Sequence, residues 1–175
     1  MKAAIIGYSG SGKSTLARTM AACYGIAALH LDQVFWLPGW QERNICEADQ
    51  LVHGFLNTHT DWVIDGNYSG MAFDRRMQEA DQIIILAFPR LTCLLRAWRR
   101  YRKNRGTSRG DMAEGCPDKM DWTFVRWILW DGRDAKHRRF YADVLENHGN
   151  KCIVLKNQRE LTKFSSGLNK KYAAL

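Results

Sequence analysis

The sequence has no long hydrophobic run, no leader-peptide pattern and no low-complexity tract. Its 175 residues contain no stretch of about eighteen consecutive apolar residues, so we expect no membrane span and no membrane partner. The apolar start of the chain passes directly into a glycine-rich turn without a cleavage-site pattern, so we expect no signal peptide. Since no internal repeat or linker is visible either, we predict a single domain, residues 1–175, of a cytoplasmic protein.

Paired cysteines are also absent. The cysteines are odd in number, and no two of them form a C-x-x-C pair. They are scattered along the chain at Cys23, Cys46, Cys93, Cys116 and Cys152. The histidines are equally dispersed. This pattern predicts free thiols in a reducing compartment, and it argues against a disulfide framework or a metal cluster.

Acidic residues are missing from one segment of the chain. The formal net charge is 26 − 18 = +8, which predicts anionic partners without naming them. Between residues 90 and 109 there are eight basic residues and no acidic one. These are Arg90, Arg96, Arg99, Arg100, Arg102, Lys103, Arg105 and Arg109. This basic segment carries a charge equal to that of the whole chain, so the remainder is close to balanced.

Short β-branched runs alternate with longer helical periods, which is typical of βαβ units around a parallel sheet. The expected strands are Lys2–Gly7, Ala27–Leu31, Trp62–Asp65, Gln82–Ala87 and Cys152–Lys156. The expected helices are Lys13–Tyr24, Asn44–Thr58, Met71–Ala80, Leu91–Lys103, a long one over Trp122–Asn147 and a short one after Gln158.

Two further expectations concern the second half of the chain. We expect the tryptophans and other apolar residues at the start of the helix over Trp122–Asn147 to pack on the core. The glycine-rich stretch Asn104–Asp121 precedes that helix and is long enough to be a functional lid, which is how we interpret it.

The first strand leads into a phosphate-binding motif. Gly7–Ser14 matches G-x-x-x-x-G-K-[ST] at every fixed position, directly after a strand and at the start of a helix. Glycines let successive amides point inward at the positive end of the helix, where Lys13 reaches the β- and γ-phosphates and Ser14 is placed for Mg²⁺. We therefore predict ATP and Mg²⁺ as cofactors. The residues assigned to ATP here are Ser9, Gly10, Ser11, Gly12, Lys13, Ser14 and Thr15.

Two acids end neighbouring strands. Because ligands of open α/β sheets lie beyond the carboxyl ends of the strands, Asp32 and Asp65 are expected at the phosphate site. Asp65 would hold a magnesium-bound water or orient the acceptor, and we assign it a catalytic role, although an Asp65–Gly66 turn is the alternative. Trp36 and Trp40 either line an acceptor pocket or anchor their loop by packing.

The basic segment has three interpretations. It is a lid that clamps phosphate, a nucleic-acid contact, or a solvated helix face. In the first, Arg96, Arg100 and Arg109 close over the transferring phosphoryl group and exclude water. In the second, residues 90–109 bind a DNA or RNA backbone. Arg18 and Lys170 have no place in these schemes, and we expect them to be surface charges.

Four more motifs give the chain a family resemblance. They are Leu29–Asp32, Pro38–Trp40, Ile64–Tyr68 and Arg109–Pro117. With the phosphate loop, they resemble the bacterial DNA topology modulation protein family, P-loop proteins related to adenylate kinase, over nearly the whole chain. The resemblance implies a three-layer P-loop NTPase fold with helices on both faces of a five-stranded parallel sheet. The implied strand order is 2-3-1-4-5, with a lid insertion over residues 104–121.

The resemblance also implies roles for individual residues. Arg96 and Arg100 have the spacing of the adenylate-kinase arginines that stack on adenine and contact phosphate, and Asn157 lies where such kinases place the base-binding loop. The Asp-Gly-Phe-Pro-Arg string of adenylate kinases is replaced by a sequence that ends in Asn67 and Tyr68. The AMP-binding arginine is therefore missing, Arg75 or Arg76 is a possible substitute from the next helix, and we place Asn67 and Arg76 in the acceptor site.

Two principal hypotheses follow for the function. The leading one is transfer of the γ-phosphoryl group of ATP to a small hydroxyl- or phosphate-bearing acceptor. The alternative is a nucleotide-gated DNA- or RNA-binding protein that affects DNA topology, and a nucleotide-binding regulator without turnover is a third possibility. The acceptor, the choice between ATP and GTP and the oligomeric state are left open by the sequence.

Overall fold

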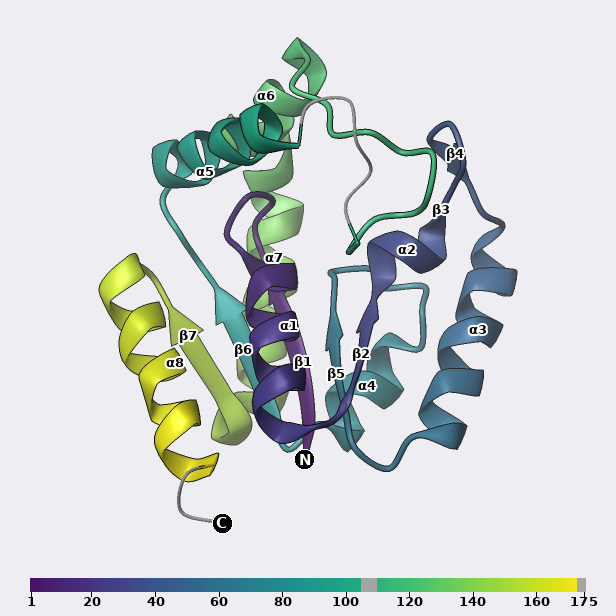
Figure 1. The fold of residues 1–175 in the computed structure, drawn as a ribbon, viewed down its shortest axis with the longest axis vertical. Helices are drawn as coiled ribbons and strands as arrows, with labels where there is room; N and C mark the ends of the chain where they lie inside the picture. Colours follow the sequence, from purple (N-terminus) through teal and green to yellow (C-terminus); the bar gives the residue numbers. More distant parts are fainter. Residues whose placement is uncertain (105–109, 173–175) are drawn as a thin grey trace.

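The computed structural model describes residues 1–104 and 110–172, with side chains up to residue 168. Its centre is a five-stranded sheet of order β2-β5-β1-β6-β7 in which every neighbouring pair is parallel (Figure 1). The strands are β1 (Lys2–Gly7), β2 (Ala27–His30), β5 (Trp62–Asp65), β6 (Gln82–Leu86) and β7 (Cys152–Leu155). The predicted order 2-3-1-4-5 is thereby confirmed, and each strand bound agrees with its prediction to within one residue.

Side chains that alternate along the strands pack into two hydrophobic cores, one on each face of the sheet. One core lies under α3 (Ile45–Thr58), α4 (Phe73–Glu79) and α7 (Ala135–His148). The other lies under α1 (Lys13–Tyr24), α5 (Arg90–Lys103), α6 (Trp122–Leu129) and α8 (Gln158–Tyr172). Because both faces are covered, the central strands are apolar at nearly every position, as buried parallel strands require.

Two short elements between β2 and α3 were not expected from the sequence. A five-residue helix, α2 (Leu31–Phe35), follows β2 directly. A two-residue antiparallel ladder then joins β3 (Trp36–Leu37) to β4 (Gln41–Glu42). The turn between β3 and β4 contains Trp40 in a left-handed conformation with φ 64°. We call Trp36–Glu42 the hairpin.

The predicted helix over Trp122–Asn147 is wrong as a single element. It is two helices, α6 and α7, separated by a 3₁₀ turn over Asp131–Arg133. Gly132 turns against Trp127, since a Cβ at this position would lie 2.9 Å from the Trp127 carbonyl oxygen. Asp134 then caps α7 by accepting a hydrogen bond of 2.8 Å from the amide of His137.

The expectation that the aromatic start of this region packs on the core is also only partly correct. Ile128 is buried, but Trp122, Trp127 and Trp130 are among the exposed large hydrophobic residues. Amphipathic spacing identified a helix here, but it did not identify which side of the helix meets the sheet.

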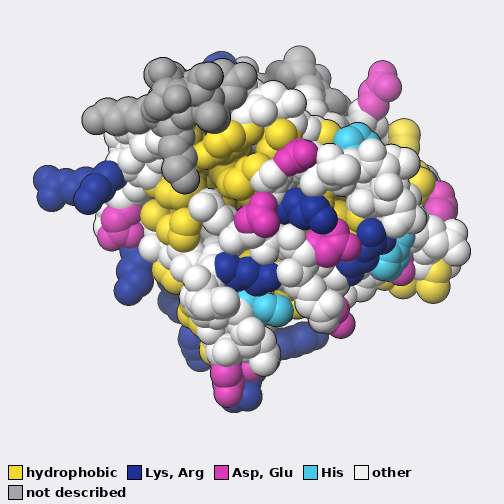
Figure 2. All heavy atoms as spheres, turned by 90° about the horizontal axis from the view of Figure 1, so that it is seen from below, with side chains coloured by type: hydrophobic (Ala, Val, Ile, Leu, Met, Phe, Trp, Pro, Cys, Tyr) yellow, Lys and Arg dark blue, Asp and Glu magenta, His cyan; other side chains and the backbone are white. Residues whose placement is uncertain are grey.

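The cysteines and the distribution of charge agree with the sequence-based predictions. All five cysteines are free. Figure 2, seen from the end at which the chain begins, shows basic and acidic side chains intermingled, as expected outside the basic segment. No helix in the described part of the chain is long and apolar enough to cross a membrane.

A buried arginine shapes the loop that follows β5. Arg76 is fully buried and donates to the carbonyl oxygens of Met71 at 2.8 Å, Tyr68 at 2.6 Å and Gly66 at 3.4 Å. Burial lowers the pKa of its guanidinium to about 10, which leaves it charged at neutral pH. The side chain predicted to bind the acceptor is thus placed beneath the loop, where it supports the backbone.

Replacing this arginine tests that structural role. Arg76→Met leaves three carbonyl groups without their buried donor, so we expect the free energy of unfolding to fall by about 3 kcal/mol. Denaturation in urea measures the change. The matched control is Arg139→Met on the exposed side of α7, which should change stability by no more than about 0.5 kcal/mol. Equal effects of the two substitutions would contradict the assignment.

Candidate active site

The phosphate loop lies between the first strand and α1, and its glycines are required by close backbone approaches. Gly7, Gly10 and Gly12 all have positive φ, at 146°, 77° and 101°. A Cβ on Gly7 would lie 2.5 Å from the carbonyl oxygen of Leu86 in β6. A Cβ on Gly10 would lie 2.5 Å from the carbonyl oxygen of Cys93 in α5. The loop is therefore pressed against both a neighbouring strand and a helix, and only glycine fits these points.

Lys13 is held by the loop itself. Its Nζ donates to the carbonyl oxygens of Gly7 at 3.0 Å and Tyr8 at 3.3 Å. Desolvation lowers the pKa of Lys13, while the carboxylates of Asp32 and Asp65 oppose this shift and Arg100 adds to it. Both predicted acids and the predicted clamp arginine are thus within electrostatic reach of the lysine ammonium.

A hydrogen-bonded chain of three side chains runs beside the lysine. The Ser14 hydroxyl donates to Asp65 Oδ2 at 2.9 Å, and Asp65 Oδ1 pairs with His30 Nδ1. Asp65 and His30 are both buried. Asp65 therefore faces the phosphate loop as predicted, and its second oxygen is fixed by a histidine that the sequence analysis did not single out.

His30 was missed although the strand-end rule applied to it. It lies opposite Asp65 in the pairing of β2 with β5. Applied to the last residue of β2 as well as to Asp32, the rule would have placed His30 and Asp65 side by side. A buried histidine is also a common core residue, so its type alone gave no signal.

Asn67 contacts the phosphate loop, whereas it was predicted in the acceptor site. Its side-chain oxygen accepts from the Gly7 amide at 2.9 Å, and its Nδ2 donates to the Gly7 carbonyl at 2.9 Å and to Tyr141 Oη at 3.0 Å. This two-way amide pairing fixes the start of the loop. Asn67 thereby joins the carboxyl end of β5 to the phosphate loop Gly7–Ser14, which we also call the cradle.

Asp32 lies at the start of α2, where Tyr68 donates a hydrogen bond of 2.7 Å to its Oδ1. Burial, followed by the negative charge of Asp32, raises the pKa of Tyr68 far above its usual range, so the phenol stays protonated as a donor. Phe35 packs on Tyr68 with ring centroids 4.8 Å apart. The carboxylate of Asp32 is thus held by an aromatic wall that continues into the hairpin.

Two arginines of α5, Arg96 and Arg100, face inward from the same side of the helix. Arg96 donates to the Ser11 carbonyl and to Gln158 Oε1, and its guanidinium lies 4.2 Å from the centre of the Phe88 ring. The Nε of Arg100 lies 3.2 Å from Asp118 Oδ2 in the lid. Arg96 therefore faces the phosphate loop and Arg100 faces the lid, while their contacts with adenine and phosphate stay predictions.

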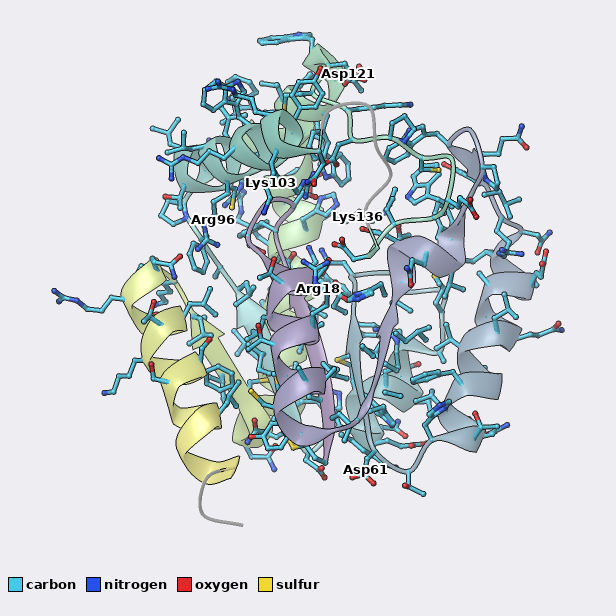
Figure 3. The ribbon with its side chains drawn as sticks, in the orientation of Figure 1. Arg18, Asp61, Arg96, Lys103, Asp121 and Lys136 are labelled. Carbon is cyan, nitrogen blue, oxygen red and sulfur yellow. The ribbon has the colours of Figure 1, made fainter. Side chains whose placement is uncertain are left out.

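The described part of the lid, residues 110–121, is docked across the top of the site. Gln33 donates to the Gly110 carbonyl at 2.6 Å, and the Gly39 amide donates to the Gly115 carbonyl at 3.1 Å. Arg18 of α1 pairs with the buried Asp111 at 2.8 Å. Arg18, which we expected to be a simple surface charge, therefore pairs with the lid; Figure 3 shows it beside α1, near the centre of the molecule.

The hairpin and the lid border an open surface pocket of about 550 Å³. Trp36, Gln33 and Arg43 line it on one side, and Met112 and Glu114 line it on the other. Trp36 and Trp40 also pack on each other with centroids 5.4 Å apart. The packing interpretation therefore holds for both tryptophans. Trp36 also lines the pocket, whereas Trp40 is not among its lining residues, and the acceptor role stays a prediction.

The remaining predicted residues lie further from this centre. Asn157 caps α8 by accepting from the Glu160 amide at 3.0 Å, next to the residue that Arg96 contacts. Thr15 is exposed on the first turn of α1. Arg109 and the side chain of Lys170 lie outside the described residues. Ser9 accepts a hydrogen bond of 3.1 Å from the indole of Trp127, an aromatic residue for which we predicted no contact with the loop.

Two solved structures resemble the chain over almost its whole length. A shikimate kinase from Acinetobacter baumannii, in complex with shikimate, superposes with a TM-score of 0.52 at 13% sequence identity, covering 99% of this chain and 93% of that one. A gluconokinase from Sinorhizobium meliloti 1021 superposes with a TM-score of 0.52 at 13% identity, covering 99% and 91%. The chain has the fold of the P-loop kinases.

Comparison with protein-family models and with curated proteins found no match. The likeness to the two kinases therefore concerns the fold, and the resemblance to the topology modulation family stays a prediction. The P-loop kinase fold explains why these residues lie close together. The cradle, the strand-end acids and the lid occupy the carboxyl end of its parallel sheet.

The contact of the phosphate loop with α5 is testable by one substitution. Gly10→Ala would place a methyl group against the Cys93 carbonyl at a φ that alanine rarely adopts, so the loop must shift. We expect about 3 kcal/mol loss in the free energy of unfolding and loss of ATP binding in calorimetry.

The control for this substitution is Gly54→Ala. Gly54 lies within α3, and a Cβ at this position would have no neighbouring side chain or distant backbone atom within 4 Å. Alanine there should raise stability by up to about 1 kcal/mol and leave ATP binding unchanged. Normal ATP binding by Gly10→Ala would show that the close approach is not needed for the cradle.

Proposed function

We propose that this protein transfers the γ-phosphoryl group of ATP to a small acceptor that carries a hydroxyl or phosphate group. The observation that carries the proposal is the convergence of Lys13, Ser14 and Asp65 around a glycine loop whose backbone is already fixed by close contacts. The similarity in fold to two P-loop kinases supports it.

The donor would be bound by groups already in place. The loop amides lie at the N-terminus of α1, where the helix dipole favours anions. Lys13 would exchange its two carbonyl acceptors for phosphate oxygens, and Arg100 would supply a second positive charge from α5. Arg96 lies over Phe88 next to Gln158, and this edge of the site is where we place the nucleotide base.

Magnesium fits the residues present. The Ser14 hydroxyl and the Asp65 carboxylate lie 2.9 Å apart, and oxygen ligands of this kind suit Mg²⁺, which keeps most of its waters. The described residues hold no group of three or more His, Cys, Asp or Glu side chains that would enclose a metal by themselves. The ion, when bound, would neutralise charge on the phosphates, while His30 keeps the Asp65 carboxylate in position.

The acceptor would enter between the aromatic hairpin and the lid. Asp32 directly precedes Gln33, which lines this pocket, and its carboxylate would accept a hydrogen bond from an acceptor hydroxyl. Arg76, our possible substitute for an AMP-binding arginine, is committed to backbone carbonyls, and Arg75 is bound to Glu79 and Asn57. These commitments favour a hydroxylated acceptor over AMP. Docking of the lid would exclude water from the transfer.

The nucleic-acid alternative retains only part of the basic segment. Arg96 and Arg100 face the cradle and the lid, so within the described part of the segment the residues that remain for an external polyanion are the exposed basic side chains of α5. The inward arginines, together with the strand-end acids, favour phosphoryl transfer over a nucleotide-gated binding protein or a regulator without turnover.

Substitution of the cradle lysine tests the proposed reaction. ATP turnover is measured as ADP release in the presence of Mg²⁺ over a panel of nucleosides, nucleotides and small hydroxylated metabolites. With an active acceptor, we expect Lys13→Ala to lower kcat by at least about 10³-fold, because the transferring phosphoryl group loses its nearest positive charge. The thermal unfolding midpoint should stay close to that of the unaltered protein.

The control is Lys163→Ala on the exposed side of α8, which removes the same charge away from the site. It should leave turnover unchanged. Substantial turnover by Lys13→Ala at normal stability would contradict the catalytic role assigned to Lys13.

The lowered pKa of Lys13 gives the binding of ATP a pH dependence. Phosphate binds the ammonium form, so affinity is full below the pKa of the free protein and falls as the pH rises through it. Because burial lowers this pKa, the fall should begin at a lower pH than an ordinary lysine would allow. In calorimetry between pH 7 and 10, Lys13→Arg should bind more weakly but without this slope, since a guanidinium stays charged. Parallel slopes for the two proteins would exclude Lys13 as the titrating group.

A further inference from the structure

One side of α5 exposes apolar side chains to solvent. Leu91, Leu95 and Trp98 are 75%, 46% and 43% exposed, and they lie at spacings of four and three residues, which places them on one side of the helix. The opposite side carries the buried Cys93 and Ala97 and packs toward the phosphate loop. We call the row Leu91–Leu95–Trp98 the outer stripe.

Basic side chains surround the outer stripe. Arg90, Arg99, Arg102 and Lys103 are exposed, and α5 contains no acidic residue. The guanidinium of Arg102 lies 4.8 Å from the centre of the Trp98 ring, so charge and apolar surface are in direct contact. The outer side of α5 therefore combines positive charge with exposed leucine and tryptophan, a pairing typical of helices that lie in a membrane interface.

The position of α5 in the molecule leaves this side accessible. The helix lies at the periphery, at the lid end of the sheet, and packs against α6 (Figure 1). α6 itself begins with Trp122, which is 71% exposed. None of the outer-stripe residues takes part in the contacts of the cradle, the lid or the pocket described above.

We propose that the outer side of α5 is a docking surface for an anionic phospholipid membrane. Exposed leucines add little affinity to a contact with nucleic-acid phosphates, whereas their burial at the acyl boundary of a bilayer strengthens binding. The basic residues would be attracted by acidic headgroups, each strengthening binding at low salt. A second copy of the chain is disfavoured because it would bring the same positive charges face to face. Our expectation of no membrane partner was drawn from the absence of a spanning segment and does not bear on a helix that lies on the surface.

The test is sedimentation of the full chain with vesicles of phosphatidylcholine containing 30% phosphatidylglycerol, at low salt, beside vesicles of phosphatidylcholine alone. We expect binding to the anionic vesicles only. Leu91→Gln/Leu95→Gln should weaken it at least tenfold, since two apolar contacts are lost. Arg99→Gln should weaken it about fivefold, because a basic residue near an anionic surface contributes about 1 kcal/mol.

Matched controls lie on other helices. Leu51→Gln on α3 removes a leucine that is 48% exposed, and Arg139→Gln on α7 removes an exposed arginine. Both should bind vesicles like the unaltered protein. Unfolding midpoints and ATP affinity should be unchanged in the double leucine variant, because the exposed leucines contribute to neither the core nor the cradle.

Several results would overturn the proposal. Absence of binding to the anionic vesicles does so directly. Binding that depends on Arg99 but not on the two leucines would reveal simple charge adsorption. Salt-sensitive binding to a DNA duplex or to single-stranded DNA, without vesicle binding, would assign this side of α5 to nucleic acid. Concentration-dependent dimerisation that Leu91→Gln/Leu95→Gln abolishes would assign it to a second copy of the chain.

Discussion

The close approach of the phosphate loop to α5 is the constraint on which the candidate active site depends. At Gly10 the loop lies against the carbonyl of Cys93 with no room for a side chain. This contact fixes the height of the loop above the sheet, and with it the positions of the amides and of Lys13. It also brings Arg96 and Arg100 of the same helix to the loop and the lid, so cradle and clamp are positioned together.

Two ion pairs join the lid to the helices beside the phosphate loop. Arg18 of α1 holds Asp111 and Arg100 of α5 holds Asp118, so both ends of the described lid are tied to helices that border the phosphate loop. The acidic partners are buried, whereas Arg18 is half exposed. Phosphate oxygens would compete with Asp118 for Arg100, which connects occupancy of the cradle to the position of the lid.

Much of the frame was predictable because local patterns agreed with one another. Continuous apolar runs led to the correct strands, and the glycine motif with the acid at the end of β5 led to Ser14, Lys13 and Asp65 as neighbours. The strand order was implied by the family resemblance. The backbone contacts of Arg76 and Asn67 could not be predicted from the sequence. A polar residue near a site can serve the backbone as well as a ligand, and only the three-dimensional path of the loop decides which. The same limit explains Trp122 and Trp130, since helical periodicity does not say which side of a helix is covered.

The hydrogen bonds of Lys13 have a consequence for ligand choice. Two of the three N–H donors of its ammonium already bond the carbonyl oxygens of Gly7 and Tyr8. An anion that draws the ammonium away from these carbonyls must offer enough new contacts to replace both bonds and the contact that each carbonyl loses. A chloride ion or a single phosphate gains little from this exchange, whereas a polyphosphate that also spans the amide row recovers more than it displaces. The occupied lysine would thus act as a threshold that favours long phosphate chains over the abundant small anions of a cell.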